Sequence, residues 1–176
     1  MRISRLTAFA AIFALAVAAA GCGGDDKASQ TEKWADGMCS ALVDWQNSVT
    51  AAGENVSKGD LSKSSLETTA NSVADANKQL RDDLDSLGKP PTETVDKAKS
   101  ALDQLGDDLN KNLQDARNAL ANASGNDVSV AITAVASSVQ AMAQDFQNTT
   151  TQLQALENDD TWKKAFENSE SCQKLS

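Results

Sequence analysis

Beyond residue 30, the apolar residues of this chain recur at intervals of three and four, which is the spacing of one face of an α-helix. A first helix is predicted over residues 31–52, with an apolar stripe formed by Trp34, Met38, Leu42, Trp45 and Val49. Gly53 and a polar run up to Lys63 are predicted to end it. Ser64 and Glu67 then match a capping box, which predicts the start of a second helix. Its heptad seam consists of Leu66, Val73, Leu80 and Leu87.

Further helices are predicted after Gly88-Lys89-Pro90-Pro91, because proline lacks the N–H that a helix needs. A third helix over residues 92–123 has a stripe formed by Val95, Ala98, Leu102, Leu105, Leu109, Leu113, Ala116, Leu120 and Ala123. A fourth over residues 127–157 has one formed by Val128, Ile132, Val135, Val139, Met142, Phe146, Leu153 and Leu156. Asp159 or Asp160 is predicted to cap a short final helix that holds Trp162 and Phe166. No segment alternates as a strand does, so we expect an all-α fold: an antiparallel, up-down-up-down four-helix bundle with a short C-terminal helix.

The N-terminal residues have the pattern of an export signal. Arg2 and Arg5 precede an uncharged apolar stretch over residues 8–20, which is shorter than the roughly 20 residues that span a bilayer. The stretch ends in Ala19-Ala20-Gly21-Cys22, which resembles the lipobox of bacterial lipoproteins, although most of that family has leucine where Ala19 stands. The resemblance implies cleavage before Cys22 and a diacylglycerol thioether on its sulfur. The alternative is ordinary secretory cleavage that leaves a free thiol.

The expected organisation is therefore a signal peptide over residues 1–21, a lipidated cysteine with a flexible tether over residues 22–30, and a helical bundle domain over residues 31–176. The chain has 16 basic and 25 acidic residues, and removal of the signal peptide makes it more acidic still. Nucleic acid is a poor partner for such a surface, because phosphate binding needs clustered Lys and Arg. Anionic lipid headgroups would also repel it, so the expected anchor is the covalent lipid.

Cys39 and Cys172 remain after Cys22 is assigned to lipid, and outside the cytoplasm such a pair is expected to form a disulfide. The alternative is two buried free thiols. In an up-down-up-down bundle the first helix begins where the fourth ends, which places both cysteines at one end, as a bridge requires. Because the lipid is at the chain start, we expect this end to face the membrane.

The side chains present exclude several kinds of catalysis. The chain has no histidine, which rules out Ser-His-Asp and Cys-His sites and histidine-bearing zinc sites. Two acidic clusters occur on predicted helices beside Lys78, Arg81 and Lys111: Asp82, Asp83 and Asp85, and Asp103, Asp107 and Asp108. We interpret them as solvated faces, with weak divalent-cation binding as the alternative. The sequence therefore predicts no enzyme, no cofactor and no metal site.

Trp34, Trp45 and Trp162 could either fill the core or contact an apolar ligand. We favour core packing, because the chain has few other large side chains. Alanine and serine are abundant on the third and fourth helices, which allows close packing or a lengthwise groove. Such a groove could hold an acyl chain or another apolar molecule.

The segment Trp34-Ala35-Asp36-Gly37-Met38-Cys39, followed by Leu42 and Trp45, resembles the opening of small, largely uncharacterised lipoproteins of actinobacteria, with Ser171-Cys172 as the partner end. The resemblance implies a location and a fold but no activity. The expected function is that of an extracytoplasmic lipoprotein at the cell membrane. It would be non-enzymatic and act as an interaction or structural module toward an unknown envelope protein or cell-wall component. The alternative is a carrier for a lipid or other apolar small molecule.

Overall fold

The computed structural model describes residues 25–58, 62–123 and 128–175, and within these ranges the chain is helical and contains no strand. The helices are α1 (Asp25–Lys58), α2 (Lys63–Ser86), α3 (Glu93–Asn122), α4 (Val128–Ala155), α5 (Asp160–Asn168) and α6 (Glu170–Gln173), with a 3₁₀ turn, η2 (Leu156–Asn158), between α4 and α5. The predicted all-α class is thus confirmed. The predicted signal peptide and Cys22 lie outside the described residues.

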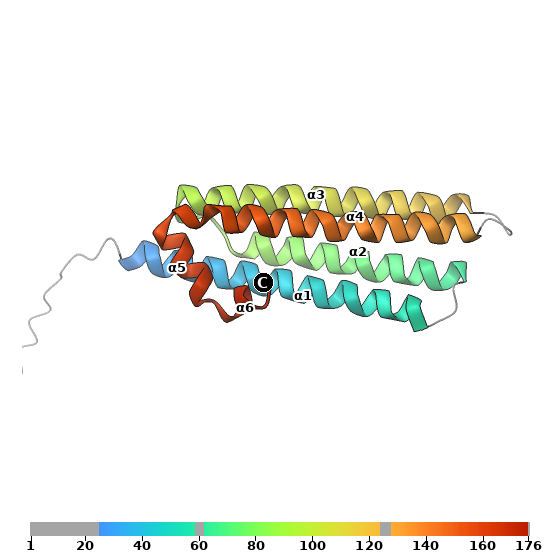
Figure 1. Cartoon of the computed structure of the whole chain (residues 1–176), viewed down its shortest axis with the longest axis horizontal. Coiled ribbons are helices and arrows are strands. Elements are labelled where there is room, and N and C mark those ends of the chain that lie inside the picture. Colours follow the sequence, from blue (N-terminus) through green and yellow to red (C-terminus); the bar gives the residue numbers. More distant parts are fainter. Residues whose placement is uncertain (1–24, 59–61, 124–127, 176) are drawn as a thin grey trace, which may run out of the picture.

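The long helices α1 to α4 extend along a common axis (Figure 1), and together they form a helical bundle. α1 packs along α2, α2 along α3, and α3 along α4. The backbones of α1 and α4 approach one another much less closely than these neighbours do. The shorter α5 and α6 fold back over the first half of α1 (Figure 1). The long helices that follow one another in the chain therefore pack closely, whereas α1 and α4 leave more space between them.

The apolar stripes predicted for α1, α2 and α3 form most of the core. The buried positions of α3 are Val95, Ala98, Leu102, Leu105, Leu109, Leu113, Ala116 and Leu120, all of which belong to the predicted stripe. Among the residues that the structure describes, the buried apolar ones lie between Trp34 and Cys172 and form the core of the helical domain.

Helix α4 buries its predicted stripe only in part. Met142 and Leu153 are buried, whereas Ile132, Val135 and Phe146 are only partly buried and Val139 is 43% exposed. Small or polar residues complete the buried face of this helix, namely Ala131, Ser138 and Thr149. The apolar stripe stays half open because α1, the helix that it faces, is not packed closely against it.

Three predicted helix boundaries were wrong. Ser62, not Ser64, caps α2, because Ser62 has an extended backbone and its Oγ accepts a hydrogen bond from the N–H of Ser65. Gly53 does not end α1, which continues to Lys58. A glycine inside a helix costs only about 1 kcal/mol relative to alanine, and a helix of this length tolerates it. At its other end α1 begins at Asp25, so residues 25–30, which were predicted to belong to a flexible tether, are helical.

Other helix ends agree with the sequence. Thr92 caps α3 by accepting a hydrogen bond from the N–H of Val95. Asp159 rather than Asp160 caps α5, and its Oδ1 accepts hydrogen bonds from the backbone N–H groups of Thr161 and Trp162. Helix α6, which the sequence did not predict, starts at its own cap, Ser169.

Candidate functional site

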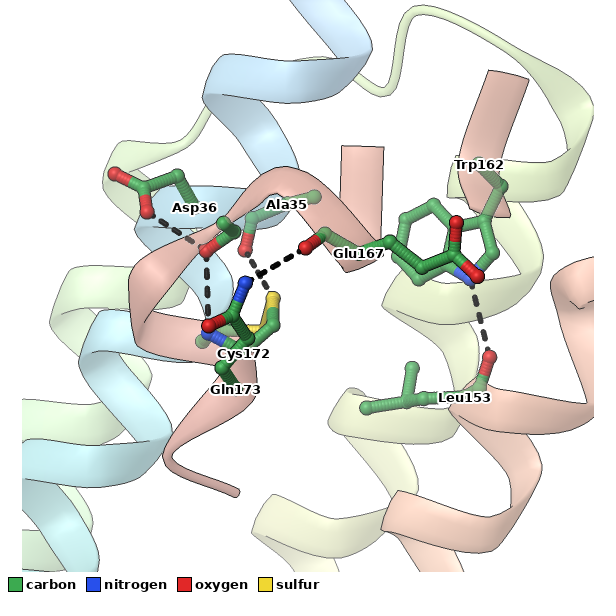
Figure 2. Close-up of a disulfide and its surroundings, with 9 residues drawn as sticks. Ala35, Asp36, Leu153, Trp162, Glu167, Cys172 and Gln173 are labelled. Atoms are coloured by element: carbon green, nitrogen blue, oxygen red, sulfur yellow. Dashed lines mark hydrogen bonds between the residues drawn. A yellow bond between two sulfur atoms is a disulfide. The ribbon is translucent and has the colours of Figure 1, made fainter. Parts of the chain in front are cut away.

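A disulfide joins Cys39 on α1 to Cys172 on α6, with a Cα–Cα distance of 4.9 Å, which confirms the predicted pairing (Figure 2). Polar contacts reinforce it: Ser169 Oγ donates a hydrogen bond to Asp36 Oδ1 at 2.7 Å and accepts one from the N–H of Cys172. Both sulfur atoms are fully buried. This part of the molecule fastens the C-terminal helices, α5 and α6, onto α1 and offers no reactive thiol.

The three tryptophans do not form one site. Trp34 on α1 and Trp162 on α5 lie together, with ring centroids 6.4 Å apart, and the ring of Phe166 on α5 lies 6.1 Å from that of Trp162. Trp162 is fully buried, and its Nε1 donates a hydrogen bond to the backbone oxygen of Leu153 (Figure 2). This aromatic cluster has the burial expected of core packing. Trp45 lies apart from it and stacks on Phe146 of α4, with centroids 5.3 Å apart.

A groove of about 730 Å³ runs between α1 and α4. Its lining comes from both helices and from the C-terminal segment: Trp45, Gln46, Val49, Thr50, Gly53, Val139, Met142, Ala143, Phe146, Gln147, Thr150, Thr151, Gln154 and Leu175. None of these side chains is charged. Sequence reasoning left open whether the helices would pack closely or leave a lengthwise groove, and between α1 and α4 they leave one.

Trp45 forms the base of the groove, and a hydrogen bond to α2 fixes its position. Trp45 is only 5% exposed, and its Nε1 donates a hydrogen bond of 2.8 Å to Asn77 Oδ1 on α2. Asn77 is itself buried, so the orientation of the indole depends on a polar contact inside the core. Phe146 then stacks on the indole from the α4 side. The aromatic base is therefore preformed rather than assembled by a ligand.

Asn77 was missed by the sequence analysis. It stands four residues after Val73 and three before Leu80, on the seam of the second helix. A polar residue at a seam position needs a buried hydrogen-bond partner, because an unpaired amide in the core costs free energy. The need of Asn77 for a buried partner, together with a tryptophan on the first helix that can donate a hydrogen bond, was the signal that could have identified this contact.

Helix α4 is nearly free of charge along its whole length. Its single charged residue is Asp145, which accepts a hydrogen bond of 2.7 Å from Asn112 Nδ2 on α3, away from α1. Two apolar side chains of α4 are exposed: Val139, which is 43% exposed and lines the groove, and Val130, which is 66% exposed and lies outside its lining. A helix with one charged residue is unusual in a chain with a formal charge of −9.

Three of the six acidic residues that the sequence singled out form ion pairs on exposed helix faces. Asp82 pairs with Lys78, Asp103 with Lys99 at 2.8 Å, and Asp107 with Arg81 at 3.5 Å. The hydrogen bond to Asp82, followed by its negative charge, raises the pKa of Lys78. Among the described residues, no three acidic or cysteine side chains converge on a point where a metal ion could sit. These contacts are those of a solvated surface.

Comparisons with known proteins do not assign the chain to a family. No family model, no curated protein and no solved structure matches it. Within the described ranges, no helix has the length and apolar character needed to cross a membrane. The groove between α1 and α4 is therefore the feature of the described fold that best indicates a function.

Proposed function

We propose that this chain is the precursor of a bacterial lipoprotein, cleaved before Cys22 and anchored by lipid to the extracytoplasmic face of the cell membrane. The N-terminal pattern supports this: Arg2 and Arg5, an apolar stretch over residues 8–20, and a lipobox-like Gly21-Cys22. A buried disulfide between Cys39 and Cys172 fits the same location, because disulfides persist outside the reducing cytoplasm.

The helical domain, in this proposal, is an antiparallel up-down-up-down four-helix bundle formed by α1 to α4. The packing of each long helix against the next one in the chain supports this topology. So does the disulfide, which joins the first part of α1 to the segment that follows α4. In this topology α1 and α4 are neighbours in space but are not consecutive in the chain, and the groove lies between them.

The function that we propose for this bundle is non-enzymatic binding of a lipid or another apolar small molecule in the α1–α4 groove. One observation carries the proposal: a groove of about 730 Å³ with a preformed aromatic base and no charged side chain in its lining. Small-molecule sites are concave, mostly apolar and of roughly 300–1,000 Å³. Of the two functions expected from the sequence, the groove favours the carrier.

A second candidate is contact with an envelope protein or a cell-wall component through α4. The observation that favours it is Val130, which is 66% exposed outside the groove lining on a helix with a single charged residue. Exposed apolar side chains on a surface with little charge are typical of protein contacts. This candidate uses the outer face of α4, whereas the carrier uses the face toward α1.

Binding of the neutral apolar dye N-phenyl-1-naphthylamine tests the carrier function. The protein would be residues 22–176 with Cys22→Ser, so that no covalent lipid competes. Ala143 is exposed and lines the groove, so Ala143→Trp should fill it and weaken dye binding at least about tenfold. Ala121→Trp places the same ring on an exposed position of α3 outside the groove, and dye binding should stay unchanged. An unmodified domain that fails to bind the dye, or equal binding by both variants, would contradict the proposal.

A further inference from the structure

The polar part of the groove lining indicates which kind of head group it accepts. We infer that the groove selects an uncharged amphiphile: an apolar chain that ends in a neutral hydrogen-bonding group, such as an alcohol, an ester or an amide. Carboxylates, phosphates and quaternary amines are excluded. The inference rests on the proposed carrier function and specifies its ligand class.

The groove offers hydrogen-bonding groups beside its apolar base. Gln46 on α1 and Gln147 and Gln154 on α4 each bring an amide that can both donate and accept. A hydrocarbon without polar atoms would leave these amides without a partner wherever it displaced water from them. An amphiphile with a neutral polar group can replace that water and keep the amides satisfied.

Two hydroxyl groups in the lining have already used their protons. Thr150 Oγ1 donates a hydrogen bond to the backbone oxygen of Phe146 at 3.0 Å, and Thr151 Oγ1 donates one to that of Gln147 at 2.9 Å. A hydroxyl has one proton to donate, so both oxygens can only accept from a ligand. They therefore suit a ligand with an O–H or N–H group, and they repel the oxygens of an anion.

No positive charge is available to balance an anion. Helix α4 contains no Lys or Arg, and α1 contains none from Trp34 to Ser57. Lys174 precedes the lining residue Leu175 in the chain, but it lines a different depression together with Glu32, Asp36 and Glu170. A carboxylate or phosphate in the groove would lose hydration without gaining a counter-ion, and the acidic domain would repel it at longer range.

A cation finds no partner in the groove either. The lining contains no Asp or Glu, and the one carboxylate of α4, Asp145, accepts a hydrogen bond from Asn112 on α3. Trp45 is 5% exposed and stacks on Phe146, so its indole does not present an open face to an ammonium group. A neutral head group can enter this groove without the free-energy cost of removing a charged group from water.

Displacement of the bound dye by three amphiphiles with the same dodecyl chain tests the inference. The amphiphiles are monododecanoylglycerol, dodecyl phosphate and dodecyltrimethylammonium, each used below its micelle-forming concentration with the protein of residues 22–176 that has Cys22→Ser. We expect the glycerol ester to bind at least about tenfold more tightly than either charged compound. Equal or tighter binding of the phosphate or the ammonium compound would overturn the inference while leaving the carrier function intact. Failure of the dye itself to bind would instead remove the carrier function.

A charge placed in the lining provides the matched control. Gln147 is exposed and lines the groove, so Gln147→Lys adds one positive charge there with little change in side-chain length. This variant should bind dodecyl phosphate about tenfold more tightly than the unmodified domain does. Gln147→Met, which keeps the length and adds no charge, should keep the preference for the glycerol ester. If Gln147→Lys leaves phosphate binding unchanged, the head group is not held by this lining and the inference is wrong.

Discussion

A single aspartate joins the start of α5 to the start of α3. Asp159 caps α5 through the N–H groups of Thr161 and Trp162, and its Oδ2 accepts a hydrogen bond of 2.8 Å from Thr94 Oγ1. The Thr94 hydroxyl, and next the N–H of Trp162, hold the pKa of the Asp159 carboxyl below its usual value. All of these hydrogen bonds favour the ionised form, so this cap depends on pH.

We predict that Asp159→Ala lowers the free energy of unfolding by about 1 kcal/mol at pH 7. Because the folded state lowers the pKa of this carboxyl, its contribution is present above the unfolded pKa of about 4 and is lost as the pH falls through the folded value. Urea unfolding at pH 7 and in acid measures the difference between the variant and the unmodified protein. That difference should shrink in acid.

Asp160→Ala is the control for the cap. Asp160 is the exposed neighbour in the first turn of α5 and accepts no capping hydrogen bond. Its substitution removes only a favourable interaction with the helix dipole, of roughly 0.5 kcal/mol. A loss for Asp159→Ala that is as large in acid as at pH 7 would show that the carboxylate charge is not what stabilises this helix start.

At the scale of elements, α5 and α6 pack against α1, and three specific contacts fasten them there. The Cys39–Cys172 disulfide is one, the hydrogen bond from Ser169 to Asp36 is another, and the Trp34–Trp162 ring contact is a third. The bundle of α1 to α4 has its own contacts between neighbouring long helices. Loss of the disulfide should therefore loosen the C-terminal helices before it affects the bundle.

We predict that the double variant Cys39→Ala, Cys172→Ala is less stable by up to about 5 kcal/mol, because the bridge closes most of the domain into one loop in the unfolded chain. Hydrogen exchange followed by mass spectrometry should show faster exchange first in residues 160–173. Exchange in α3 should rise only with global unfolding. Reductant should reproduce this pattern in the unmodified protein and leave the double variant unchanged. Equal loss of protection in α3 and α5 would contradict the separation that we propose.

At the scale of the whole molecule, the proposed anchor at Cys22 lies close in sequence to the start of α1. α1 begins at Asp25, close in sequence to Cys22, and α5 and α6 lie over the first half of that helix (Figure 1). The groove lies farther along α1, from Trp45 to Gly53. With the lipid on Cys22, the C-terminal helices would be nearer the membrane than the far end of the groove.

We predict that Cys22→Ser moves the protein in cells from the membrane fraction to the soluble fraction, because the covalent lipid is the proposed anchor and an anionic bilayer repels the acidic domain. Detergent phase partitioning and the intact mass of the extracted protein measure the change. The mass of the unmodified protein should exceed that of its cleaved polypeptide by the mass of the attached lipid. The double alanine variant of Cys39 and Cys172 retains Cys22 and should stay in the membrane fraction. If the Cys22→Ser protein stays there too, another anchor exists and the lipobox assignment is wrong.

The sequence alone determined the features that depend on local spacing. The steps of three and four from Val95 to Leu120 predicted both the extent of α3 and its buried face. Asp159 was one of two predicted caps because its side chain can reach the first N–H groups of the helix that follows. Cys39 and Cys172 could be paired because they are the two cysteines left once Cys22 is assigned to lipid, and the expected order of the helices places them at one end. Each of these depends on neighbours a few residues away or on the order of the elements.

Tertiary structure decided how closely the helices approach one another. A Cβ on Gly37 would lie 2.5 Å from Leu87 Cδ2, so α1 meets the end of α2 at a point that only glycine fits without a shift of Leu87. Between α1 and α4 the backbones approach one another less closely, and Val139 is left on the wall of an open groove. Trp34 and Trp45 share one predicted stripe, yet only Trp45 lies at that groove. The distance between two helices is set by packing on all their sides at once, and no local spacing records it.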